Sequence, residues 1–136
     1  MPLGIRPQVE LPHPNFLKEV GEQGIREMVS QHYECLRKSE ISSLFPPTDN
    51  TFEKAKLRSS DFFIQICGGR QYFNENRGAP MMARPHQPFK ITPKGRLVWL
   101  NCYINVLGNM TVSQESLQSF WHYINIFSLW MLNSED

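Results

Sequence analysis

The sequence has no excess of charge of one sign and no apolar run long enough to cross a bilayer. Its 136 residues carry a formal net charge of +1, whereas domains that bind nucleic acid or anionic membranes are typically basic. A membrane-spanning helix needs about 20 consecutive apolar residues, and the sequence contains no such stretch. We therefore expect no nucleic-acid partner, no membrane association and a cytoplasmic location.

Cysteine is also scarce. There are three cysteines, Cys35, Cys67 and Cys102. Their number is odd, and no two of them have the C-x-x-C spacing. This pattern indicates neither a disulfide framework nor a zinc site, and we expect the three side chains to act as small buried apolar groups.

Strand patterning is missing, because apolar residues recur with the i, i+3, i+4 spacing of amphipathic helices. The sequence predicts a short helix from an Asn15 cap to Gly21, followed by helices over 25–36, 52–66, 93–108 and 114–131. It therefore predicts an all-α fold. The proline-rich residues 1–14 form an N-terminal extension, and residues 15–136 form one domain.

Turn and capping residues separate these helices. Pro46 ends a single turn over 41–45, Gly68 begins a Gly-Gly stop after 66, and Thr92 and Ser113 cap the last two helices. The apolar face of the 93–108 helix is expected to hold Leu97, Leu100, Ile104 and Leu107, with Trp99, Tyr103 and Val106 beside them.

Residues 70–91 have neither helical nor alternating periodicity, so the sequence predicts a long loop there. A loop of about twenty residues is uncommon in a compact domain unless it carries function. A bound cofactor would explain it.

Several motifs together resemble group II truncated haemoglobins. They are Tyr33, Gly68-Gly69, Glu75-x-Arg77-Gly78-x-Pro80, Arg84-x-His86-x-Pro88-Phe89-x-Ile91 and Trp99-Leu100-x-Cys102. The resemblance implies a globin-like two-over-two helical sandwich with a long proximal loop, and haem b (iron protoporphyrin IX) bound between the two helix pairs.

The resemblance assigns roles to three residues of this sequence. His86 becomes the proximal ligand of the haem iron, for which a neutral imidazole is well suited. Tyr33 and Trp99 become the distal hydrogen-bond donors to a bound ligand. Two such bonds, at about 0.5–1.5 kcal/mol each, would slow oxygen release by roughly ten- to a hundred-fold.

Other positions form the expected haem environment. The resemblance places Ala55 where other globins have a distal histidine, and Phe45 where it would stack on the porphyrin. Pro85 stands where relatives often have an arginine that binds a haem propionate, and Arg84 or Lys90 would bind that propionate here. The expected pocket wall consists of Phe62, Phe63, Phe89, Ile91 and Val98.

Two distal positions keep two interpretations each. Ser59 either adds a third hydrogen bond to the ligand or bonds to its own helix backbone. His32 is either a hydrogen-bonded histidine behind the haem wall or a sixth ligand of the ferric iron.

The resemblance implies reversible binding of O2, CO, NO and similar small ligands, as in oxygen transport. The alternatives are a redox enzyme acting on nitric oxide, nitrite or peroxide with a reductase as electron donor, or a sensor. A third class, a haem-free helical module, predicts a colourless protein.

Overall fold

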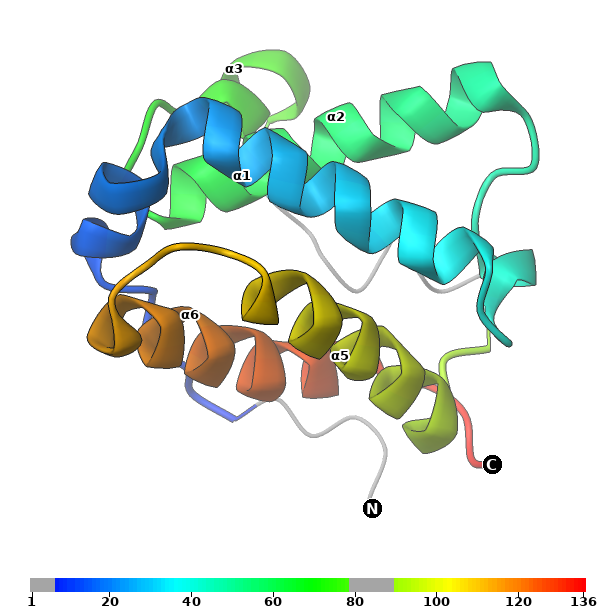
Figure 1. Cartoon of the computed structure of the whole chain (residues 1–136). Coiled ribbons are helices and arrows are strands. Elements are labelled where there is room, and N and C mark those ends of the chain that lie inside the picture. Colours follow the sequence, from blue (N-terminus) through cyan, green and yellow to red (C-terminus); the bar gives the residue numbers. More distant parts are fainter. Residues whose placement is uncertain (1–6, 79–89) are drawn as a thin grey trace.

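The computed structural model describes residues 7–78 and 90–136, and every regular element in these two ranges is helical. In chain order they are α1 (Pro14–Arg37), η1 (Ser42–Leu44), α2 (Asp49–Ile66), α3 (Tyr72–Arg77), α5 (Pro93–Gly108), α6 (Gln114–Phe127) and η2 (Ser128–Met131). Figure 1 shows α1 and α2 crossing over a second layer made by α5 and α6. The predicted all-α, two-over-two architecture is confirmed.

The first helix begins two residues earlier than the sequence predicts, with its cap at His13 and not at Asn15. Helix α1 starts at Pro14, and Nδ1 of His13 accepts the Asn15 N–H at 3.1 Å. Proline suits the first helical turn because its missing N–H would have no partner there. The helix is interrupted at Gly21, where φ is 73°, so the predicted end of the first short helix lies at that residue.

The Gly-Gly pair ends α2 as predicted. Thr48 caps the start of this helix with its hydroxyl. After the last turn Gly68 takes a φ of 92°, a left-handed conformation that glycine adopts without steric cost. The Gly69 N–H then donates to the Ile64 carbonyl at 2.9 Å, which closes the end of the helix.

The prediction of a loop without secondary structure over 70–91 is wrong for its first part, which forms α3. The Gln65 side chain holds this short helix, accepting the Asn74 N–H and donating to the Asn74 side chain, both at 3.0 Å. Phe73 is buried and Arg77 pairs with Asp61 at 2.9 Å. Six residues are too few to show helical periodicity in the sequence, so this helix is stabilised by its tertiary contacts and could not be predicted from the pattern. Residues 79–89 lie outside the described residues.

Thr92 and Ser113 cap α5 and α6 as predicted, each accepting a backbone N–H three residues later. The predicted apolar face of α5 is partly wrong, because Leu97 is 54% and Ile104 52% exposed. The buried arc of α5 is centred near Tyr103, and at about 100° per residue these two side chains fall outside it.

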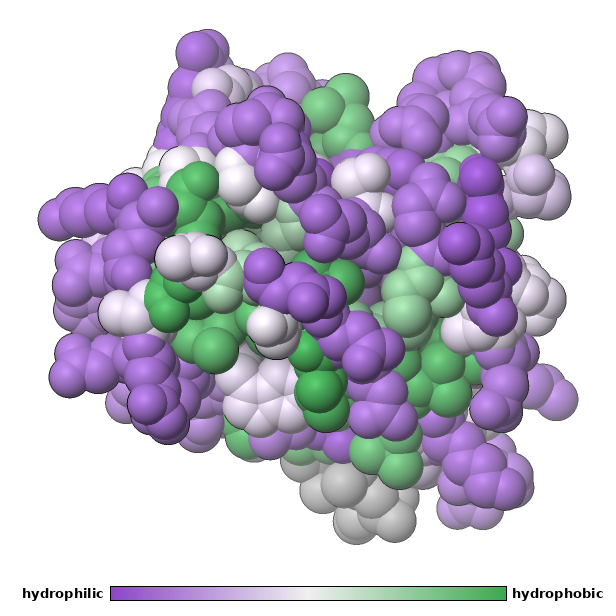
Figure 2. All heavy atoms as spheres, in the orientation of Figure 1, coloured by the Kyte–Doolittle hydropathy of each residue, from purple (hydrophilic) through white to green (hydrophobic). Residues whose placement is uncertain are grey.

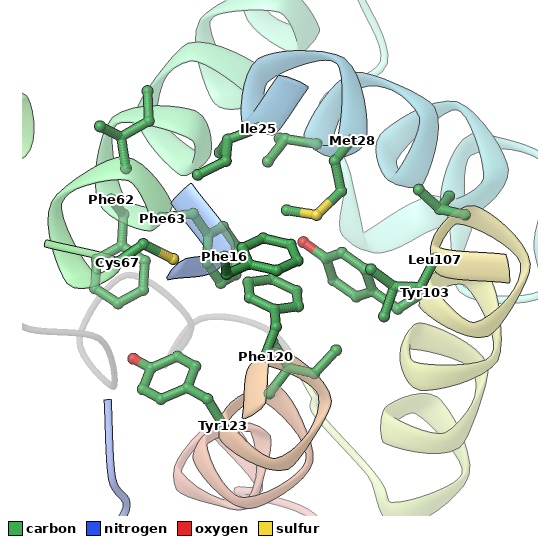
Figure 3. Packing of buried hydrophobic residues seen from close by; sticks show 14 of the residues in the cluster. Phe16, Ile25, Met28, Phe62, Phe63, Cys67, Tyr103, Leu107, Phe120 and Tyr123 are labelled. Atoms are coloured by element: carbon green, nitrogen blue, oxygen red, sulfur yellow. The ribbon is translucent and has the colours of Figure 1, made fainter. Parts of the chain in front are cut away.

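Aromatic rings fill the space between the two layers. Phe16 of α1 stacks on Phe120 of α6 with ring centroids 4.5 Å apart, and Figure 3 shows Tyr103 reaching the same cluster from α5. Cys67 and Cys102 are buried as predicted, whereas Cys35 is only half-buried.

The described part of the predicted N-terminal extension packs on the helical domain. The Trp130 indole donates to the Pro7 carbonyl at 2.9 Å, and the His13 N–H donates to the Ser119 hydroxyl at 2.7 Å. Pro12 between them is buried. This segment is therefore attached to α6 and η2.

On the face shown in Figure 2, hydrophilic residues cover most of the surface and apolar residues appear between them. Within the described ranges, no helix combines the length and the apolar character that a membrane span requires.

Candidate functional site

A cavity of about 520 Å³ opens between α1, η1, α2, α5 and the end of α6. Its volume is typical of small-molecule pockets, which measure about 300–1,000 Å³. Most of the side chains around it are aromatic or aliphatic. Among the described residues that line it, only Arg58 and Arg96 carry a permanent charge, so the cavity suits a large apolar group with anionic substituents.

The structure brings most of the sequence-predicted site residues together here. The cavity is lined by His32, Tyr33, Phe45, Ala55, Ser59, Phe62, Phe63, Ile91 and Trp99. Val98 is half-buried on α5 but is not among the lining residues, and Lys90 is exposed. His86, the predicted iron ligand, lies outside the described residues, as do Arg84, Pro85 and Phe89.

Tyr33 faces the cavity from α1. The edges of its ring contact Phe45 and Phe52, with centroids 5.5 and 5.7 Å away. Burial raises the pKa of the phenol, while a hydrogen bond with Ser59 and the charge of Arg58 partly oppose this shift. The net shift is upward, so Tyr33 keeps its proton at neutral pH and remains a donor.

Ser59 takes a role that neither sequence interpretation included. Its hydroxyl lowers the pKa of the Tyr33 phenol, and both residues line the cavity. A serine hydroxyl that donates to the phenol oxygen leaves the single phenol proton of Tyr33 free for a ligand in the cavity. Ser59 would then act on such a ligand through Tyr33.

His32 lines the cavity and is buried, with only 1% of its surface exposed. Nε2 lies 3.0 Å from the Trp99 carbonyl, and the ring stacks on Tyr103 at a centroid distance of 3.5 Å. Burial lowers the pKa of His32 to about 3, so the ring is neutral at physiological pH. Because a carbonyl only accepts, we assign the proton to Nε2. This leaves Nδ1 as a buried acceptor without a partner among the described residues.

Trp99 reaches the cavity from α5, whereas Tyr33 reaches it from α1. Its indole packs edge-on against His32 at 5.0 Å and Tyr103 at 4.9 Å, and lies 6.4 Å from Phe127. These three contacts restrict the rotation of the indole. The cavity therefore has a phenol and an indole, both capable of donating a hydrogen bond, on two different helices.

Sequence reasoning missed several lining residues. Arg58 is exposed on α2, and no pattern in the sequence distinguishes it from other surface arginines. Arg96 on α5 is fixed by the Ser128 hydroxyl at 2.9 Å and the Asn125 side chain at 2.8 Å. Phe73 lies in the segment predicted as loop. The remaining missed residues are Ile41, Ser43, Leu44, Pro46, Pro47, Gly95, Phe127, Ser128 and Met131, of which Phe127 and Met131 had a signal in the helical spacing of 114–131.

The family model of the bacterial-like globins matches residues 15–133. The chain belongs to this family. The family implies a haem cofactor that binds small gaseous ligands such as O2, and the cavity of this globin, with its aromatic wall and two arginines, fits such a group.

Known relatives agree with this family and with the predicted subgroup. The globin is 25% identical over 117 residues to the group 2 truncated hemoglobin YjbI of Bacillus subtilis, covering 86% of this chain and 87% of that protein. Phosphate-bound Hell's gate globin IV superposes with a TM-score of 0.92 at 34% identity, over 97% of this chain and 82% of that one. The group II truncated hemoglobin of Bacillus anthracis superposes with a TM-score of 0.82 at 25% identity, over 89% and 98%. The resemblance to group II truncated haemoglobins is confirmed.

Proposed function

We propose that this globin binds haem b in the cavity and reversibly binds O2 and other diatomic ligands there, with Tyr33 and Trp99 as hydrogen-bond donors. The observation that carries the proposal is the position of these two side chains, which face one apolar cavity from α1 and α5. When bound, the haem iron supplies the coordination site for the diatomic ligand.

The lining residues have the chemistry needed to hold the group. Phe45, Phe62, Phe63 and Ile91 provide an apolar wall, and burying an aromatic macrocycle against such a wall is favourable. We assign the propionates to Arg58 and Arg96, because a guanidinium matches a carboxylate in charge and shape. His86 remains the proposed iron ligand, and Arg84, Lys90, Phe89 and Val98 remain proposed neighbours of the haem.

Tyr33 and Trp99 would act by donating to a ligand that gains partial negative charge. The raised pKa of Tyr33 keeps its phenol protonated, and an indole N–H is always a donor. A hydrogen bond contributes about 0.5–1.5 kcal/mol net, so each donor would slow ligand release by about two- to thirteen-fold.

One observation favours ligand binding over the redox-enzyme alternative. Enzymatic reduction of nitrite or peroxide needs a group that delivers protons near neutral pH. Burial lowers the pKa of His32 to about 3 and raises that of Tyr33, so neither group exchanges a proton readily near pH 7. The redox function with a reductase partner is therefore the second candidate, and a haem-based sensor the third. A cytoplasmic location remains part of the proposal.

The absorption spectrum of the purified protein tests the cofactor and its accessibility together. We expect a Soret band that shifts on reduction and again on addition of carbon monoxide, and that is lost when His86→Gly removes the proposed ligand. A colourless protein that gives no sharp band with added haemin would refute the haem proposal.

Stopped-flow measurement of oxygen dissociation tests the donors. Tyr33→Phe and Trp99→Phe should each raise the rate by about two- to thirteen-fold. Phe52→Leu is the control, because it changes a ring that contacts Tyr33 and removes no donor. Unchanged rates in both donor variants would contradict the assignment.

A further inference from the structure

The residue that directly precedes one proposed donor is in contact with the other. His32 comes just before Tyr33 on α1, and its Nε2 N–H donates to the backbone carbonyl of Trp99 on α5 at 3.0 Å. The same imidazole stands edge-on to the Trp99 indole, with centroids 5.0 Å apart and an angle of 88° between the ring planes. One side chain of α1 therefore contacts both the backbone and the side chain of Trp99.

The core holds the imidazole of His32 in place. Only 1% of this residue is exposed, and its ring stacks on Tyr103 with centroids 3.5 Å apart and planes 19° apart. Tyr103 lies one turn after Trp99 on α5 and packs against the indole at 4.9 Å. Phe63 and Phe120 contact Tyr103 in turn, at 6.2 and 5.9 Å, within the cluster shown in Figure 3. Packed rings therefore set the position of His32, and this position does not depend on a ligand.

The fold alone does not account for a histidine at this position. Trp99 lies inside α5, and a carbonyl within an α-helix accepts the N–H four residues later, so the helix already supplies a partner for the Trp99 carbonyl. Nδ1 of His32 is buried and has no partner among the described residues, and an unmet buried acceptor lowers stability. A phenylalanine would keep the stack on Tyr103 and leave no such atom. What the imidazole adds is the hydrogen bond to Trp99.

We propose that His32 is a positioning residue, which holds the Trp99 indole in the place from which it donates to a ligand in the cavity. This role rests on the proposed function, because it needs Trp99 to act as a donor. His32 acts through Trp99 and not through Tyr33. The Tyr33 ring has closer contacts with Phe45 and Phe52, at 5.5 and 5.7 Å, than with His32, at 6.3 Å.

Stopped-flow measurement of oxygen dissociation from the haem-loaded protein tests this role. His32→Phe keeps a ring on Tyr103 and removes the bond to Trp99, so it should speed release by about twofold or more, and by no more than Trp99→Phe does. His32→Gln retains an N–H that can reach the carbonyl, and its release rate should lie nearer to that of the native protein. Tyr103→Phe is the matched control. It keeps the ring and removes a buried hydroxyl that has no partner among the described residues, so its release rate should be unchanged.

Double variants separate positioning of Trp99 from a general effect on the fold. Because His32 acts through Trp99, adding His32→Phe to Trp99→Phe should leave the release rate of Trp99→Phe unchanged. In the Tyr33→Phe protein, His32→Phe should keep its full effect, because the effects of independent sites add. A histidine that only supports the packing of the core would change release by the same factor in both backgrounds, and that result would overturn the proposal.

The protonation of the imidazole gives a second readout, which does not depend on oxygen release. Nuclear magnetic resonance of the full-length protein with isotope-labelled histidine distinguishes the two neutral tautomers of each ring. The sample is the carbon monoxide complex, or the protein as purified if it takes up no haem. We expect His32 to carry its proton on Nε2, and this proton to exchange slowly with water, because it is buried and bonded to the Trp99 carbonyl. A proton on Nδ1 would show that this bond does not form and would overturn the proposal.

Different failures have different meanings. If Trp99→Phe speeds oxygen release and His32→Phe does not, the positioning role is overturned and the proposed function stands. If His32→Gln releases oxygen as fast as His32→Phe, the hydrogen bond to the Trp99 carbonyl does not position the indole, and the proposal is overturned as well. If neither Trp99→Phe nor Tyr33→Phe changes release, the proposed function fails and this role fails with it.

Discussion

The buried neutral histidine in the cavity wall makes the protein sensitive to acid. His32 has a pKa of about 3 in the folded state because burial disfavours its charged form, against an ordinary value of 6.5. Between these two values the unfolded chain binds a proton that the folded protein does not. The stability of the folded state is therefore complete above pH 6.5 and falls as the pH drops toward 3.

The size of the effect follows from the two pKa values. At pH 5 the unfolded state gains RT ln(1 + 10^1.5), about 2 kcal/mol, from protonating His32, while at pH 7.5 it gains less than about 0.1 kcal/mol. His32→Gln removes this titration and keeps an N–H near the position of Nε2, so that the bond to the Trp99 carbonyl can still form. From pH 7.5 to pH 5 the native protein should lose about 2 kcal/mol more unfolding free energy than the variant.

Urea unfolding followed by far-ultraviolet circular dichroism, repeated across this pH range, gives the comparison directly. Other titrating groups are common to both proteins and cancel in the difference. His122→Gln is the control, because it makes the same replacement at an exposed position and leaves the buried ring of His32 in place. If the His32→Gln curve runs parallel to that of the native protein, the argument from burial is wrong.

Three further predictions concern stability. Gly69→Ala should lower the free energy of unfolding by about 1–3 kcal/mol in urea, because its β-carbon would lie 2.9 Å from the Ile64 carbonyl oxygen. The control Gly108→Ala, whose β-carbon meets open space, should leave the stability unchanged or raise it, and equal effects of the two substitutions would contradict the argument. Asp61→Asn should lower the free energy of unfolding in urea by about 2–3 kcal/mol, which is less than the loss of a fully buried ion pair, since its partners Arg26 and Arg77, at 3.1 and 2.9 Å, are 28% and 25% exposed. An unfolding free energy unchanged within error would show that the two ion pairs contribute nothing. Hydrogen bonds, chiefly from Ser116, lower the pKa of Glu19 below 4.5, so Glu19→Gln should lower the free energy of unfolding at neutral pH. The difference in unfolding free energy between the variant and the native protein should vanish as the pH falls through the lowered pKa, and a difference independent of pH would refute the argument.

Much of the fold is predictable from local chemistry. Thr92 and Ser113 start helices because their side chains supply acceptors for free backbone N–H groups, and Gly68 marks an end because the chain needs a left-handed residue there. The six-residue helix α3 was missed because side chains of α2 hold it in place. Leu97 and Ile104 fit the apolar period of their helix but lie outside the arc that the other layer covers.

The candidate site needed more than periodicity. Tyr33 and Trp99 are 66 positions apart in the sequence, and each fits an apolar helix face that would be ordinary core. The resemblance to a family brought them together, and the cavity contains both. Neither periodicity nor the resemblance predicted Arg58 as a cavity residue, because its position at the cavity depends on how α2 is rotated relative to α1.

The attachment of the N-terminal segment has a consequence for how the chain folds during synthesis. The Pro7 carbonyl and the Trp130 indole are 123 positions apart, and contacts between distant positions form late. A ribosome must produce residue 130 before the Pro7 carbonyl has this partner, so the segment that precedes α1 docks only after α1, α2, α5 and α6 have all been made.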